Sequence, residues 1–145
     1  MDFFNRLLHA ITELHPTHPM FVHFPIALTG AAFLFILLAY WRNSQSLEQA
    51  AFANMVLASI STVVAGFTGV MDNARNYDGA APNSSIKFTL AILLFLLTSL
   101  TSIVRYRNPE IFQKGNRLLY MASYGLSFAI ALVLAFLGGV ILYGF

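Results

Sequence analysis

Four long runs of apolar residues, separated by short polar segments, dominate the pattern along this chain of 145 residues. The runs cover roughly residues 20–41, 50–71, 86–104 and 118–143. Each has about the 20 residues that an α-helix needs to cross the hydrocarbon core of a bilayer. Because only short connections remain between the runs, the pattern predicts an all-α fold. We expect an integral membrane four-helix bundle that forms a single domain over residues 1–145.

A shorter amphipathic segment precedes the first run. Over residues 3–14, apolar side chains recur at helical spacing, and most polar side chains fall on the other side. This pattern is typical of a short helix that lies in the membrane interface. A helix packed on another subunit would show the same pattern, so both interpretations stay open.

The composition agrees with a membrane protein and excludes several kinds of site. The chain is 58% hydrophobic and 10% charged, whereas a soluble domain has roughly 25% charged residues. It has no cysteine, which excludes disulfides, thiolate metal sites and covalently attached c-type haem. The few basic residues are divided among the loops, so we do not expect nucleic-acid binding.

The distribution of basic residues predicts the orientation in the membrane. The first and third connections lie on one side and have five basic residues, against three on the other side. They are Arg42, Arg105, Arg107, Lys114 and Arg117 on the first side, and Arg6, Arg75 and Lys87 on the other. Because basic loops stay in the cytoplasm, both termini are expected outside it.

Two histidines and two prolines open the first apolar run, in the stretch HPMFVHFPIAL of residues 18–28. Histidine is costly inside a bilayer, so His23, just within the span, is a functional candidate. If the four helices run antiparallel, two spans begin and two spans end near the same face of the membrane. The first and third spans begin there, and the second and fourth end there. That level has four polar or ionisable residues, His23, Asp72, Lys87 and Tyr143.

His23 suggests a cofactor site, because neutral imidazole is a common axial and metal ligand. Gly30, two helical turns further on, would leave space for the flat ring of haem b. A second ligand to that haem would come from His18, in a non-helical entry segment, or from Lys87. A quinone hydrogen-bonded to His23 at the same level is the other cofactor that we expect.

Each of these features also has a simpler structural interpretation. Small residues are the usual means by which membrane helices approach one another closely. Asp72 and Lys87 can form an interfacial ion pair or reach out to water. The ring of His23 can bind a carbonyl group of a neighbouring helix.

The stretch HPMFVHFPIAL closely resembles the opening of a bacterial family of small membrane proteins, domain of unknown function 2231. The closing stretch LGGVILYG, residues 137–144, is similar to the glycine-rich end of that family, and Gly69 and Asp72 resemble the end of its second span. The resemblance implies a four-span bundle in the bacterial inner membrane. It also implies a redox setting with a haem-binding role, since members occur beside cytochrome-like modules. The family usually has a histidine near the start of the third span, where this chain has Lys87.

Two functions follow as hypotheses. The first is a membrane subunit of a respiratory or photosynthetic electron-transfer complex, without independent catalytic activity, that binds haem or quinone near His23. The second is a structural subunit that packs against a larger membrane complex. In both cases the partners are membrane lipid and other membrane subunits. A transporter is less supported, because no ionisable residue lies near the middle of a span, where transport sites usually lie.

Overall fold

The computed structural model of the protein describes residues 3–9 and 18–143, and within these residues it contains helices and no strand. The helices are α1 (Phe3–His9), α2 (His18–Arg42), α3 (Gln45–Asn76), α4 (Ser84–Arg107), α5 (Ile111–Lys114) and α6 (Arg117–Tyr143). Four of them, α2, α3, α4 and α6, are long and apolar enough to cross a membrane. The predicted all-α membrane bundle is therefore confirmed.

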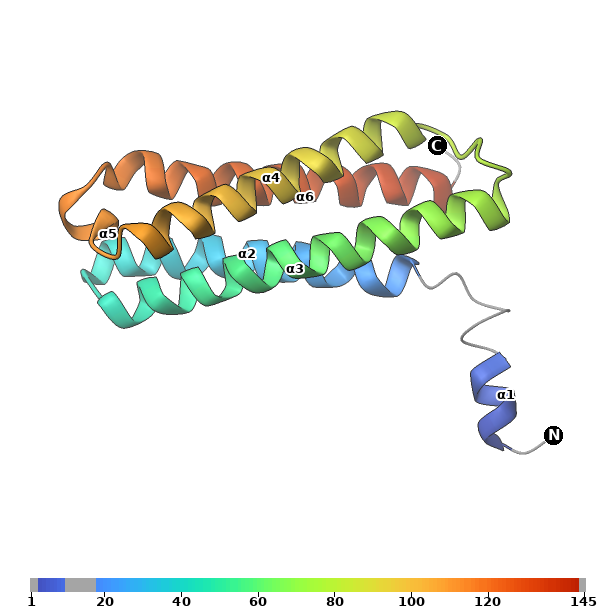
Figure 1. Cartoon of the computed structure of the whole chain (residues 1–145), viewed down its shortest axis with the longest axis horizontal. Helices are drawn as coiled ribbons and strands as arrows, with labels where there is room; N and C mark the ends of the chain where they lie inside the picture. The colour runs from blue at the N-terminus through green and yellow to red at the C-terminus, as the bar shows by residue number, and fades with distance from the viewer. Residues whose placement is uncertain (1–2, 10–17, 144–145) are drawn as a thin grey trace.

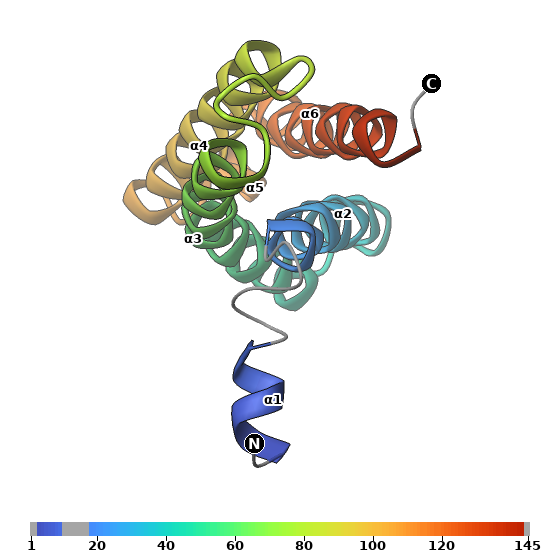
Figure 2. The same ribbon diagram turned by 90° about the vertical axis from the view of Figure 1, so that its right-hand side faces the viewer.

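The four long helices run antiparallel, each packed against two neighbours (Figure 1). Helix α2 packs along α3 and against α6, and α4 closes the ring between α3 and α6 (Figure 2). We call the end where α2 and α4 begin, and where residues 77–83 connect α3 to α4, the cavity end. The opposite end, with α5 and the connection between α2 and α3, is the network end.

Helix α1 stands apart from the bundle (Figure 1), and the apolar side chains of Phe3, Phe4 and Leu7 are exposed. The predicted helix of residues 3–14 is described only as Phe3–His9, and residues 10–14 lie outside the described part. The interfacial and the partner-bound interpretations of this segment both stay predictions.

The helices extend beyond the apolar runs that predicted them. Helix α3 begins five residues before the second run and ends five residues after it. Its first turn is stabilised by Ser44, whose hydroxyl accepts a hydrogen bond from the backbone N–H of Leu47 at 3.4 Å. The runs were shorter because hydropathy marks the part of a helix in lipid, whereas polar caps and end residues continue its hydrogen bonding.

The tightly packed core lies toward the network end. Fully or almost fully buried side chains from four helices form one cluster there. Its members are Ala32, Ile36, Ala39, Ala51, Met55, Phe112, Tyr120 and Tyr124. Large apolar side chains on the outer faces of the helices are exposed, as expected of a surface that contacts lipid. Packing thus closes one end of the bundle.

One of the charges used to predict orientation is buried inside the bundle. Arg105 lies inside α4, where its side chain is buried and forms an ion pair with Glu48. Without it, the basic residues number four against three. The orientation with both termini outside the cytoplasm stays a prediction. It now depends on a smaller difference in the number of basic residues between the two sides.

Candidate functional site

A cavity of about 980 Å³ lies between the four long helices at the cavity end. Four of the six predicted site residues line it, namely His18, His23, Asp72 and Lys87. They come from α2, α3 and α4, and α6 supplies the remaining wall through residues 131–139. Ligand pockets usually have volumes of about 300–1,000 Å³. The antiparallel arrangement thus brings these distant residues around a single space that is large enough for a cofactor.

Glycines widen this cavity. A Cβ atom placed on Gly66, Gly138 or Gly139 would have nothing within 4 Å apart from its own surroundings in the helix. All three glycines line the cavity. Small residues in membrane spans usually bring helices into close contact, but these three glycines leave space between the helices.

His18 is the first residue of α2, so its predicted place in a non-helical entry segment is wrong, and it is held against α3. Its backbone N–H donates to Asp72 Oδ2 at 3.2 Å, and its ring Nδ1 lies 3.0 Å from the carbonyl oxygen of Ala65 and 3.3 Å from Thr68 Oγ1. A carbonyl oxygen only accepts, so Nδ1 bears the proton, and the neutral ring has its lone pair on Nε2. A Cβ atom on Gly69 would lie 2.8 Å from the ring, so this glycine makes room for it.

Asp72 and Lys87 do not form the ion pair that was one of their simpler interpretations. Among the described residues, the carboxylate of Asp72 instead accepts the hydrogen bond at the start of α2. A carboxylate at a helix N-terminus satisfies an otherwise unpaired N–H and is favoured by the helix dipole. Lys87 is partly buried on α4 and lines the cavity. It supplies a cation to the cavity wall.

His23 lies at the edge of the cavity and is mostly exposed. Its Nδ1 binds the carbonyl oxygen of Pro19, one turn earlier in the same helix. Ala27 on the same face is exposed as well, whereas Pro25 and Thr29 are buried. The inward face of α2 is therefore offset from the stripe through His23, and His18 is the histidine that packs against protein.

The other two predicted site residues contribute differently. Gly30 does not line the cavity, because the ring of Phe128 fills the space beside it; a Cβ atom there would lie 3.0 Å from that ring. The space expected for a flat macrocycle beside Gly30 is thus occupied by a side chain. Tyr143 ends α6, and its side chain lies outside the described part of the structure.

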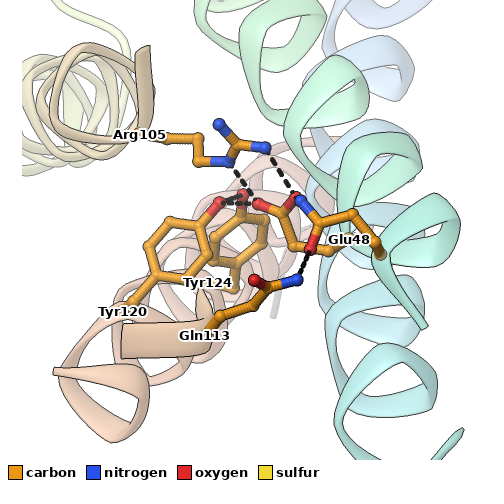
Figure 3. Close-up of polar contacts among 6 residues, drawn as sticks. Glu48, Arg105, Gln113, Tyr120 and Tyr124 are labelled. Carbon is orange, nitrogen blue, oxygen red and sulfur yellow. Dashed lines mark hydrogen bonds and ion pairs between the residues drawn. The ribbon is translucent and has the colours of Figure 1, made fainter. Parts of the chain in front are cut away.

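A second polar cluster lies at the network end, and the sequence did not predict it (Figure 3). Glu48 is fully buried and accepts two hydrogen bonds from Arg105, Nε to Oε1 at 2.5 Å and Nη2 to Oε2 at 2.8 Å. The hydroxyl of Tyr120 donates to Glu48 Oε1 at 2.9 Å and lies 2.7 Å from the hydroxyl of Tyr124. These four residues, which we call the Glu48 network, connect α3, α4 and α6.

A signal for this network was present in the chain. On α4, the buried side chains are Leu94, Thr98, Thr101 and Arg105, which recur at helical spacing. Thr98 and Thr101 lie on one face of the third span, and continuing that face by one turn beyond Thr101 reaches Arg105. We placed that residue in a loop because its charge ended the apolar run. Nothing in the sequence indicated Glu48 as its partner, since the two residues are 57 positions apart.

Comparison with known proteins supports the membrane location. The family described as predicted membrane protein (DUF2231) matches residues 14–145, which includes the whole four-helix bundle. No curated protein and no solved structure matches the sequence. The chain belongs to the DUF2231 family of predicted membrane proteins.

Proposed function

We propose that the protein is a membrane subunit of an electron-transfer complex that binds a quinone in the cavity at the cavity end. The observation that carries the proposal is the cavity itself, with polar groups at its mouth and apolar walls deeper in the bundle. A quinone has a polar head that accepts hydrogen bonds and an apolar tail. Its two parts match the two parts of the cavity.

The polar residues of the cavity supply complementary hydrogen-bonding groups. Lys87 is a donor for a quinone carbonyl oxygen, and His18 Nε2 is an acceptor for the hydroxyl of the reduced form. Because Ala65 fixes the proton on Nδ1, the acceptor of His18 is oriented before a ligand binds. Val22, Ile26 and other apolar side chains of the cavity wall would lie beside the tail, deeper in the bundle.

A haem with two histidine ligands does not fit these residues. The two ligands must approach the iron from opposite faces of the ring, along one line. His18 and His23 lie five residues apart on one helix, a rotation of about 140°, and the His18 ring packs against α3. The space beside Gly30 is filled by Phe128. We therefore favour the quinone over the haem.

The test is binding of a short-chain quinone to the protein purified in a mild detergent. A ligand at 100 times its Kd stabilises a protein by about 2.7 kcal/mol, which thermal unfolding resolves. Gly138→Leu should abolish this stabilisation, because its side chain would enter the cavity. The matched control is Ala53→Leu on the exposed face of α3, which should respond like the wild type.

Two results would contradict the proposal. Equal stabilisation of the wild type and Gly138→Leu would place the quinone elsewhere. An absorbance spectrum with a Soret band, together with no response to quinone, would favour haem.

The structural-subunit hypothesis is favoured by one observation, the exposed apolar side chains of α1 outside the bundle. If α1 holds a neighbouring subunit, removing residues 1–9 should release the protein from a complex that Gly138→Leu leaves intact. Co-purification of the two variants from membranes distinguishes the two functions.

A further inference from the structure

We infer that the cavity is an aqueous half-channel, filled with water from the cavity end to the middle of the bundle and closed toward the network end. This inference concerns access to the site and rests only in part on the proposed function. For a bound quinone, the half-channel would supply protons from one side of the membrane. Its test needs no quinone, so the two proposals can fail separately.

The mouth of the cavity is polar and faces outward. Arg75, Asn76 and Ser85 line it and are exposed. His18 and Lys87 continue the polar lining inward. At roughly 30 Å³ for each molecule, a volume of about 980 Å³ holds about 30 water molecules. Thr62, one helical turn from the floor, adds a hydroxyl group to the deep part of the lining. Polar partners along the cavity and this volume are the conditions under which a cavity is hydrated.

The cavity reaches about the middle of the bundle. On α4 its lining extends from Ser84 to Leu94, a rise of about 15 Å at 1.5 Å per residue. The hydrocarbon core of a bilayer is about 30 Å thick. Water in the cavity would therefore cross about half of the membrane.

A floor of fully buried side chains closes the cavity, with one residue from each long helix. Its members are Thr29, Ala58, Thr98 and Ser127, each 0% exposed. Each lies four residues, one helical turn, beyond a lining residue of the same helix: Pro25, Thr62, Leu94 and Ala131 respectively. The hydroxyl groups in the floor donate to carbonyl oxygens of their own helices, Thr29 to Pro25 at 2.6 Å for example. The floor is thus closely packed and internally hydrogen-bonded.

Two further layers lie between the floor and the opposite membrane face. Ile36 and Met55 are fully buried in the core. Beyond them, the Glu48 network ties α3, α4 and α6 together. The carboxylate of Glu48 has its oxygens occupied by these donors, so it does not open a polar path. The geometry therefore gives access from one side only.

The absence of cysteine from the chain makes labelling of single introduced thiols a direct test. Gly66→Cys and Gly138→Cys place a thiol in the cavity without a clash. Ala58→Cys places one in the floor. Ala80→Cys and Asn108→Cys mark the two membrane faces, since both residues are exposed in connections at opposite ends. A membrane-impermeant maleimide is added to spheroplasts and, separately, to inverted vesicles.

We expect Gly66→Cys and Gly138→Cys to be labelled in the preparation that labels Ala80→Cys and to stay unlabelled in the other. Ala58→Cys should stay unlabelled in both preparations. If neither cavity thiol reacts in either preparation, the cavity is not hydrated and the inference is wrong. Labelling of a cavity thiol, or of Ala58→Cys, from the side of Asn108→Cys would show that the network end is not closed. Two cavity positions guard against the loss of one variant through misfolding.

Discussion

Replacing Glu48 or Arg105 singly should destabilise the bundle far more than replacing both. The side chain of Glu48 is 0% exposed and that of Arg105 is 9% exposed, and two hydrogen bonds join them. Glu48→Met leaves the guanidinium group without its partner and removes the acceptor of the Tyr120 hydroxyl. Arg105→Met leaves a buried carboxylate with only weaker donors.

The magnitude follows from the burial of the pair. Removing one partner of a buried ion pair costs about 3–5 kcal/mol, and the lost bond from Tyr120 adds about 1 kcal/mol. Arg105 lies two residues before the end of α4, so after Glu48→Met its long side chain can reach toward the membrane surface and recover part of the loss. We expect about 3 kcal/mol for Glu48→Met and about 4 kcal/mol for Arg105→Met.

The double variant decides between an ion pair and two independent side chains. Replacing a buried pair by apolar residues of similar size is often close to neutral. We therefore expect the double variant to lose less than about 1.5 kcal/mol. The free energy of unfolding is measured by titration with sodium dodecyl sulfate in mixed micelles, followed by circular dichroism. Losses that add in the double variant, or a single variant that loses less than about 1 kcal/mol, would refute this reasoning.

Four further variants test smaller features by the same titration. Gly69→Ala should lower the free energy of unfolding by about 1 kcal/mol, because the new methyl group displaces the ring of His18 from its hydrogen bonds. Gly66→Ala should raise it by up to about 1 kcal/mol through helix propensity. Equal effects of the two variants would show that the position of the ring does not depend on Gly69. Asp72→Ala should lower the free energy of unfolding by about 0.5–2 kcal/mol, because the backbone N–H at the start of α2 loses its acceptor. An unchanged stability would mean that water replaces the carboxylate as acceptor. Arg117→Lys should lower the free energy of unfolding by about 0.5–1 kcal/mol, because the guanidinium carbon of Arg117 lies 4.2–4.3 Å from the centres of two aromatic rings. A gain in stability would contradict a stabilising contact with these rings.

The fold was predictable because lipid imposes one strong condition on the chain. Backbone polar groups have no water to bind in the hydrocarbon core, so an apolar run of about 20 residues becomes a helix. Short connections then require antiparallel neighbours. The same reasoning placed His23, Asp72 and Lys87 at one level, and all three line the cavity. Depth along a helix axis can be counted from the sequence.

The direction in which each side chain points could not be counted in that way. His23 shares a stripe with Ala27 and Gly30, but that stripe is not the inward face of α2. Which face turns inward depends on the neighbour, and here the ring of His18 fits the space that Gly69 leaves on α3. A small-residue stripe is equally compatible with close contact and with open space.

The sequence by itself determined the number of spanning helices, their order and the common level of His23, Asp72 and Lys87, because hydropathy and helical rise can be followed along one chain. Only the tertiary structure decided that Gly66, Gly138 and Gly139 face a cavity and that Glu48 meets Arg105. Both facts depend on how four helices rotate about their axes and how far apart they lie. Those quantities are set by contacts between segments distant in the chain, and no local pattern contains them.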